Sequence, residues 1–305
     1  MLDHSETRGP SPHQIHQALW AYSTTIDAFG LIAAAAKTGL TPKEGCVTNF
    51  QGARIPVSVC PDILGSLQGT LEAAPAPGNW HACVAEWGAA LHAVDQANPD
   101  TAFRMVELGC GWACWMLATG IAARSRGLRV ELRGVEADPD HLRQAKQVME
   151  LNNFSSGEFQ LHNAIAAPRP GTALFPCADR GHQTDWGRGA LFDTKGPDGF
   201  HSTLPCITLS DLSEGRKIDL LHMDIQGGEL DFVRGAWNDI NSYVNRVLIG
   251  THGRIIEGAL FEKFTSHGWT LEVERPAICR LENGHHEVII DGVQLWCSPN
   301  GLASS

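Results

Sequence analysis

Two apolar runs in this sequence end in a carboxylate beside a turn. Glu107 lies in the run 103–108, which stops at Gly109-Cys110-Gly111, and Glu136 ends the run 129–136. Glycines at such a turn let backbone N–H groups and a ligand approach closely. A carboxylate at the end of the following strand can accept hydrogen bonds from both ribose hydroxyls of an adenosine. These two segments predict a binding site for a nucleotide-like ligand.

The negative charge of Glu107 narrows the class of ligand. A phosphate gains nothing from a neighbouring carboxylate, whereas an ammonium group is attracted to it. The dinucleotide fingerprint also requires a third glycine near position 114, where Cys114 stands. The segment therefore disfavours NAD and FAD and favours a ligand with a cationic amino-acid group. A tight turn with an incidental Glu is the alternative.

Three later runs also bring polar residues to their ends. Asn163 follows the third run, and its amide can contact an adenine edge or form a turn. His222 and Asp224 are two residues apart and therefore share one face of a strand. His252 ends another run beside glycine. Glu229 opens a helix, where its charge also favours the helix dipole without any ligand.

The histidines and cysteines do not have the spacing of a zinc site. We therefore expect no metal in the predicted site. A divalent cation shared by Asp224, Glu229 and His252 is the alternative.

Strand and helix patterns alternate from residue 102 onward, which predicts how these residues are positioned. Parallel strands joined through helices form a sheet covered on both faces. We expect a Rossmann-like α/β fold with a seven-stranded, mostly parallel sheet, whose last two strands form an antiparallel pair at one edge. The turn signal between those two is Glu282-Asn283-Gly284. The expected strands are 103–108, 129–136, 158–165, 217–224, 244–251, 269–275 and 287–297, with helices at 112–125, 139–152, 228–240 and 254–267.

Residues 1–98 are expected to form a helical and β extension that covers the substrate or serves an interface. A capping box at Ser11 predicts a helix that continues to Phe29, 46–59 resembles a hairpin, and Asn79 can cap a second helix. Residues 99–305 then form the catalytic domain. Within it, the stretch 166–205 is rich in glycine and proline and predicts a long loop over the substrate.

Composition excludes several classes of protein. The chain has 305 residues and a net charge of −11, and no basic run exceeds two residues, so we expect neither nucleic acid nor a membrane as partner. Nine scattered cysteines, without a secretory signal, indicate a cytoplasmic protein with reduced thiols. Aromatic residues of the extension are candidates for an interface, so a homo-oligomer is an open alternative.

Together these motifs resemble the class I S-adenosylmethionine-dependent methyltransferases, and within them the FkbM-type family, whose members mostly methylate hydroxyl groups of sugars, glycans and polyketides. The resemblance covers about 100–275 and rests on Val106-Glu-Leu-Gly-Cys-Gly111, Val135-Glu-Ala-Asp138, Ile207-Thr-Leu-Ser-Asp-Leu212 and Ile218-Asp-Leu-Leu-His-Met-Asp-Ile-Gln-Gly-Gly-Glu-Leu230. Three positions depart from the family pattern. Ala113 stands where the family usually has Gly, Gln226 where it has Glu, and Gly228 where it has Ala.

The resemblance implies S-adenosylmethionine as cofactor. Glu107 and the glycine turn would then face the methionine ammonium, Glu136 the ribose, and Asn163 the adenine. The residues expected to bind the cofactor are Glu107, Gly109, Cys110, Gly111, Glu136, Ala137, Asn163, Ala164 and Asp224.

Transfer of a methyl group to a hydroxyl also requires a base near the reacting atoms. We expect His252 to be that base, with His222 as second choice, and Asp224 to orient the donor or acceptor. Trp186 and Glu229 are expected to contact the substrate, a small molecule or glycan. An N- or C-methyltransferase, or a protein that binds S-adenosylmethionine without turnover, is the alternative.

Overall fold

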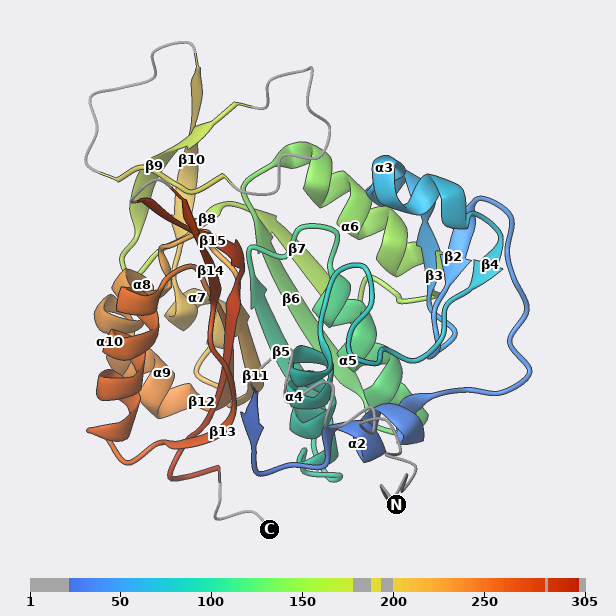
Figure 1. Cartoon of the computed structure of the whole chain (residues 1–305). Helices are drawn as coiled ribbons and strands as arrows, with labels where there is room; N and C mark the ends of the chain where they lie inside the picture. The colour runs from blue at the N-terminus through green and yellow to red at the C-terminus, as the bar shows by residue number, and fades with distance from the viewer. Residues whose placement is uncertain (1–21, 178–187, 193–199, 283–284, 302–305) are drawn as a thin grey trace, which may run out of the picture.

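The fold is built on one eight-stranded sheet with the strand order β1-β13-β16-β12-β11-β5-β6-β7 (Figure 1). The structure is a computed structural model that describes residues 22–177, 188–192, 200–282 and 285–301. The five strands from β12 to β7 pair in parallel. β16 is antiparallel to both of its neighbours, and β1 pairs antiparallel with β13. The sheet strands are β1 (Ser23–Thr24), β5 (Phe103–Leu108), β6 (Val130–Glu136), β7 (Phe159–Asn163), β11 (Ile218–Met223), β12 (Val244–Thr251), β13 (Thr270–Arg275) and β16 (Gly292–Cys297).

Helices cover both faces of this sheet because its strands are apolar on both sides. Met105 belongs to the core under α4 and α5, whereas its neighbour Val106 belongs to the core under α8 and α10. Successive side chains of a strand point to opposite faces, so one strand serves both cores. Figure 1 shows these two groups of helices on opposite sides of the sheet. The helices are α2 (Ala28–Ala35), α3 (Pro61–Leu64), α4 (Val84–Asp95), α5 (Cys114–Ser125), α6 (Pro139–Leu151), α7 (Leu209–Ser213), α8 (Glu229–Gly235), α9 (Trp237–Tyr243) and α10 (Arg254–Thr265).

This architecture confirms the predicted Rossmann-like α/β class, with two differences. The sheet has eight strands rather than the predicted seven, because β1 pairs with β13, and the strand order differs at the carboxyl-terminal edge. β13 and β16 form the expected antiparallel pair, but β16 lies inside the sheet, between β12 and β13. The predicted turn at 282–284 does not join them. β14 (Ile278–Glu282) and β15 (His285–Ile290), which precede and follow it in the sequence, pair as a separate hairpin, and residues 283 and 284 themselves lie outside the described residues.

The amino-terminal part differs from the prediction in its helices. The first part of the expected helix, up to residue 21, lies outside the described residues, and β1 occupies part of the remainder before α2 begins. α4 begins after Cys83 rather than Asn79, because the Glu86 carboxylate accepts a hydrogen bond from the Cys83 N–H at 3.0 Å and completes the cap. The predicted hairpin is confirmed as β2 (Cys46–Thr48) and β3 (Arg54–Pro56), with β4 (Thr70–Leu71) alongside.

The stretch 166–205 is not the continuous loop that its composition suggests. β8 (Ile165–Ala166), β9 (Gly171–Pro176) and β10 (His201–Ile207) form a three-stranded sheet in the order β8-β10-β9. β8 follows directly on β7, so this small sheet stands at the carboxyl ends of the parallel strands (Figure 1). Across the described ranges, no helix has the length and apolar character needed to cross a bilayer.

Candidate active site

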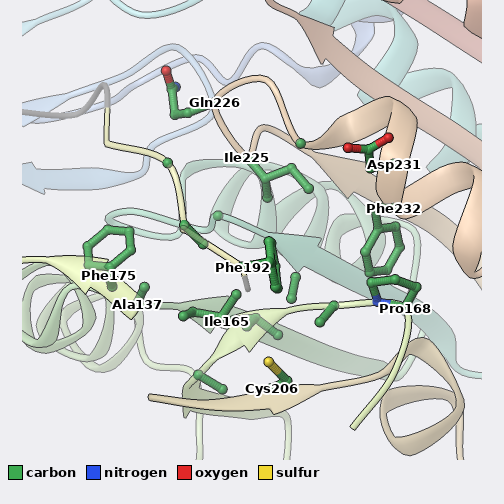
Figure 2. Close-up of a pocket in the computed structure, with 18 of the residues that line it drawn as sticks. Ala137, Ile165, Pro168, Phe175, Phe192, Cys206, Ile225, Gln226, Asp231 and Phe232 are labelled. Atoms are coloured by element: carbon green, nitrogen blue, oxygen red, sulfur yellow. The ribbon is translucent and has the colours of Figure 1, made fainter. Parts of the chain in front are cut away.

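A cavity of about 850 Å³ opens where the carboxyl ends of β5, β6 and β11 meet the small sheet. Gly109, Gly111 and Glu136 line one part of it, and Asp224 lines another. Apolar side chains from the stretch 166–205 complete the wall, and Figure 2 shows Phe192 between Ile225 and Ile165. In open α/β sheets this is the edge at which ligands bind.

Gly109 fixes how closely the ends of β5 and β11 approach each other. Its φ is +71°, and a Cβ at this position would lie 1.9 Å from the Asp224 carbonyl oxygen. Both facts require glycine. Ala113, where the family usually has Gly, adopts a left-handed conformation with φ 66° and caps α5 without a side-chain hydrogen bond. The Gly turn therefore forms as predicted, and the family departure at Ala113 is accommodated with some backbone strain.

Glu136 lines the cavity at the end of β6, as expected for a ribose-binding carboxylate. Its two carboxylate oxygens accept hydrogen bonds of 2.8 Å from the N–H groups of Gly111 and Asp138. A carboxylate has about four acceptor positions, so these two bonds orient it and leave acceptor capacity for a ligand. Burial raises the pKa of Glu136, and the N–H groups of Asp138 and Gly111 oppose that rise.

Glu107 lies behind the turn rather than in the cavity. Its side chain is 1% exposed, and it accepts hydrogen bonds from the N–H groups of Met116 at 2.8 Å and Trp115 at 3.3 Å. Those N–H groups belong to the first turn of α5, which Ala113 cannot cap with its own side chain. Burial raises the pKa of Glu107 to about 8, against the lowering effect of these backbone bonds. The contact of Glu107 with a ligand ammonium stays a prediction.

The remaining residues of the predicted cofactor site divide into two groups. Ala137 and Ala164 line the cavity. Cys110 is buried, and a Cβ on Gly134 would lie 2.8 Å from its sulfur, so it packs under the turn. Asn163 donates from its amide nitrogen to the carbonyl oxygens of Glu136 and Ala137 at 3.0 and 2.9 Å. Asn163 thus fixes the turn after β6, which matches the turn-forming alternative.

An ion pair that no sequence motif indicated lies at the rim of the cavity. Arg188 donates hydrogen bonds to the Asp138 carboxylate and to the Pro176 carbonyl oxygen. Burial favours the neutral acid, but Arg188 and the N–H groups of Asp140 and His141 outweigh it and lower the pKa of Asp138. Asp138 belongs to the motif Val135-Glu-Ala-Asp138, and the structure shows that it also caps α6. Nothing in the glycine-rich stretch around Arg188 indicated its partner.

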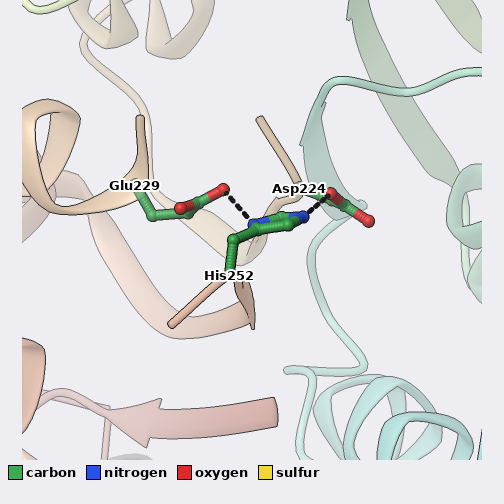
Figure 3. A group of neighbouring side chains, drawn as sticks. All are labelled: Asp224, Glu229 and His252. Atoms are coloured by element: carbon green, nitrogen blue, oxygen red, sulfur yellow. Dashed lines mark ion pairs between the residues drawn. The ribbon is translucent and has the colours of Figure 1, made fainter. Parts of the chain in front are cut away.

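Asp224, Glu229 and His252 come together as predicted, and the imidazole lies between the two carboxylates (Figure 3). Nδ1 of His252 is 2.9 Å from Glu229 Oε1, and Nε2 is 3.3 Å from Asp224 Oδ1. A third carboxylate, Asp291, lies 3.8 Å from Nε2. Gln226 donates a hydrogen bond of 3.0 Å to Asp224 Oδ1. The Glu-to-Gln departure therefore leaves a donor beside Asp224 in place of another acid.

This arrangement changes what His252 can do as a base. Burial disfavours the charged imidazole, but the pairing with Asp224 and Glu229 outweighs it and raises the pKa of His252 to about 10. The ring is then protonated at neutral pH in the absence of any other cation. A charged His252 cannot accept a proton from an acceptor hydroxyl, so the geometry does not favour the expected role as free base.

Glu229 and His222 are more deeply buried than their expected roles require. Glu229 is fully buried, and its Oε1 accepts from the N–H groups of Ile225 and Gly227 at 3.1 and 3.2 Å. It stabilises the turn before α8, which is the alternative that its sequence position left open.

His222 packs against the Trp115 ring, and burial lowers its pKa to about 4, so it is neutral. Trp186 lies outside the described residues.

Comparison with known proteins identifies the family of this chain. The model of the "Methyltransferase FkbM domain" matches residues 97–286. A protein of Jannaschia sp. (strain CCS1), named "Putative methyltransferase", is 48% identical over 271 residues, which cover 86% of this chain and 95% of the relative. The chain belongs to the FkbM methyltransferase family, as its motifs predicted.

Two solved structures align with parts of this chain at low sequence identity. Methyltransferase FkbM from Methylobacillus flagellatus KT aligns with a TM-score of 0.43 and 15% identity, over 64% of this chain and 43% of that chain. Magnesium protoporphyrin IX methyltransferase (ChlM) from Synechocystis PCC 6803, solved with bound SAM, aligns with a TM-score of 0.38 and 10% identity. That alignment covers 70% of this chain and 77% of that chain.

Proposed function

We propose that this methyltransferase uses S-adenosylmethionine to methylate a hydroxyl group of a sugar, glycan or polyketide-like small molecule. The observation that carries the proposal is Glu136. This carboxylate lines the cavity, is held by Gly111 and Asp138, and keeps acceptor positions for two ribose hydroxyls. Family membership supports the methyl-transfer activity.

S-adenosylmethionine supplies an electrophilic methyl group on a sulfonium. The residues of the cavity would hold that methyl group in position. Ala137 and Ala164 offer a small-residue wall beside Glu136, where an adenine fits, and the Gly109–Gly111 turn stands at the other end. Alignment of the nucleophile with a bound methyl group contributes roughly 7–11 kcal/mol to such reactions. For the cationic end of the donor we retain Glu107, whose buried charge an ammonium would stabilise.

Asp224 is the residue we assign to the acceptor. It lines the cavity, and 42% of its side chain is exposed, so it can accept a hydrogen bond from an incoming hydroxyl. Phe175 and Phe192 line the same cavity from the stretch 166–205 and offer flat surfaces to a sugar or polyketide. Trp186 remains a proposed substrate contact. His252 holds Asp224 in position through its pairing at 3.3 Å.

One observation favours a second candidate, methylation of nitrogen. A charged His252 leaves the Asp224 side of the cavity without a free base. An amine acceptor is already nucleophilic and needs no proton removed before the transfer. Acceptor panels should therefore include amines as well as alcohols. A protein that binds the donor without turnover would bind S-adenosylmethionine and methylate neither class.

The test is a donor titration followed by a transfer assay. Glu136→Ala should weaken S-adenosylmethionine binding measured by calorimetry by about tenfold or more, because each hydrogen bond to a charged group is worth roughly 1.5–3 kcal/mol. Glu150→Ala, an exposed change on α6, is the matched control and should leave affinity unchanged. Equal affinities in both variants would remove the ribose assignment. Transfer of labelled methyl to alcohols, with none to amines, would support the hydroxyl acceptor.

The cysteine composition supports our further proposal that the protein works in the cytoplasm, since the nine cysteines are free thiols. We propose a small-molecule or glycan partner and neither nucleic acid nor a membrane, on the basis of the net charge of −11.

A further inference from the structure

Gln226 has an unusual backbone conformation and a side chain directed at Asp224. It lines the cavity two residues after Asp224 and is half-buried. Its φ is +57°, in the left-handed region that residues other than glycine rarely adopt. Its side chain folds back and donates a hydrogen bond of 3.0 Å to Asp224 Oδ1. Such backbone strain persists only where surrounding contacts maintain it, and it is concentrated at functional sites. The bond to Asp224 is one of the contacts that maintain it here.

The contact with Asp224 requires a hydrogen-bond donor at position 226. A charged carboxylate only accepts hydrogen bonds, so the amide nitrogen of Gln226, and not its oxygen, must face Asp224. The backbone of the same turn is already engaged, because the N–H groups of Ile225 and Gly227 donate to Glu229 Oε1 at 3.1 and 3.2 Å. The side chain of Gln226 is therefore the donor that this turn offers to Asp224.

The two oxygens of Asp224 have different surroundings. Oδ1 accepts the hydrogen bond from Gln226 and also lies 3.3 Å from Nε2 of the charged His252. Oδ2 has no hydrogen-bond partner among the described residues, and 42% of the Asp224 side chain is exposed. Figure 3 shows this second oxygen pointing away from the imidazole ring. One oxygen is therefore held from two sides, whereas the other is available to a ligand of the cavity.

We propose that Gln226 is a positioning residue: its amide and the His252 ring together hold Oδ1 of Asp224, so that Oδ2 is the oxygen that accepts a hydrogen bond from the methyl acceptor. The assignment of Oδ2 to the acceptor rests on the proposed function. The terminal torsion of an aspartate is broad and nearly two-fold, so a carboxylate that is free to rotate presents either oxygen. Methyl transfer requires the acceptor atom to be in line with the donor. With Oδ1 fixed, an acceptor hydroxyl meets one oxygen in one orientation.

The neutral side chain of Gln226 also affects the charge of Asp224. Burial favours the neutral acid, but His252, His222 and Gln226 outweigh it and lower the pKa of Asp224. A carboxylate at position 226 would place two negative charges at the distance of the present hydrogen bond, and one of them would take up a proton. The titratable groups that act on Asp224 come from several elements: His222 of β11, His252 after β12, Asp291 before β16, Glu107 of β5, Cys114 of α5 and Glu86 of α4.

The experiment follows the Asp224 carboxyl group in the full chain, without donor or acceptor. Carbon NMR of protein labelled at the aspartate carboxyl carbons gives the pKa of Asp224, and Asp224→Asn assigns its signal. Gln226→Glu should raise that pKa by about one pH unit or more, because a neighbouring carboxylate disfavours the charged form. Gln226→Leu should raise it by less, because this change removes the donor without adding a charge. Gln226→Asn, which tolerates the left-handed backbone but has a shorter side chain, should resemble Gln226→Leu and serves if the latter fails to fold.

Gln96→Glu is the matched control. Gln96 also donates to an aspartate, Asp95, at 3.1 Å, but both residues are exposed. The same chemical change is thus made beside a carboxylate outside the cavity, and it should leave the pKa of Asp224 unchanged.

Turnover then tests the positioning role. With an alcohol that the unmodified protein methylates, Gln226→Asn should lower kcat about tenfold and leave the affinity for S-adenosylmethionine unchanged, because Gln226 acts on the acceptor side. An Asp224 pKa that is the same in all three Gln226 variants and the unmodified protein would overturn the proposal, and so would an altered pKa with unchanged kcat. Failure of the proposed function has a different signature: the unmodified protein would transfer no methyl group, while the differences in the pKa of Asp224 would remain.

Discussion

A buried carboxylate such as Glu107 costs free energy whenever it is charged. Burial raises its pKa to about 8, whereas an unfolded Glu has a pKa of about 4.3. The folded protein therefore binds a proton that the unfolded chain releases, and stability is lost as the pH rises from about 4.3 toward 8. The slope is at most about 1.4 kcal/mol per pH unit for one group.

Glu107→Gln should remove this pH dependence. The free energy of unfolding of the variant, relative to that of the unmodified protein, should increase steadily between about pH 5 and pH 8, because Gln carries no charge to desolvate. Urea denaturation at several pH values measures it. Parallel pH profiles for the two proteins would mean that Glu107 is charged in the fold at neutral pH, and would contradict the prediction.

Single residues show what the sequence could and could not indicate. The position of Glu136 was predictable, because a strand end and a glycine turn define it locally. The environment of Glu107 was not, because its partners are the N–H groups of Trp115 and Met116 in the next element. The sequence does carry a signal for this: Ala113 begins α5 without a capping side chain, so another group must supply the acceptor.

At the scale of elements, Arg188 joins the stretch 188–192 to the turn between β6 and α6. It binds the Asp138 carboxylate and the Pro176 carbonyl oxygen, and its guanidinium lies 5.2 Å from the Phe175 ring centroid. The side chains of Arg188 and Asp138 are 11% and 5% exposed, so water screens their interaction little. The pair therefore holds one wall of the cavity in place.

Arg188→Ala should loosen that wall and release the donor faster. We expect the dissociation rate of S-adenosylmethionine to rise about tenfold, since a charge-assisted hydrogen bond is worth roughly 1.5–3 kcal/mol. Stopped-flow displacement measures this rate. Arg188→Lys can bind Asp138 but cannot span both partners, so an intermediate rate is expected. If all three proteins release the donor at the same rate, the Arg188–Asp138 ion pair does not determine how fast the donor leaves the cavity.

Elements were predictable where local pattern determines them. β5 and β12 have the predicted limits, because continuous apolar runs end abruptly at turn residues. The placement of β16 was not predictable, since insertion between β12 and β13 depends on which sheet edge is free. The same holds for Asp291, which joins the site only through that insertion. The pairing of strands far apart in the sequence thus places Asp291 at the site, which local sequence patterns do not indicate.

At the scale of the whole molecule, the amino-terminal part shares its core with the sheet. Residues of α2 and α4 pack in the same cluster as Met105 of β5 and Leu295 of β16. α4 approaches α2 closely at Gly88, because a Cβ there would lie 2.4 Å from the Cβ of Ala28. The two helices of the extension thus meet at a contact that allows no added methyl group.

Gly88→Ala should destabilise the protein although alanine is the better helix former. Overpacking costs roughly 1–3 kcal/mol, against about 1 kcal/mol gained in helix propensity. We expect a net loss of up to about 2 kcal/mol, measured as a lower midpoint of thermal unfolding. Gly258→Ala is the matched control, because α10 has open space at that position, and it should gain about 0.5–1 kcal/mol. Equal gains in both variants would show that α2 can move away from α4 at no cost, and would contradict the prediction.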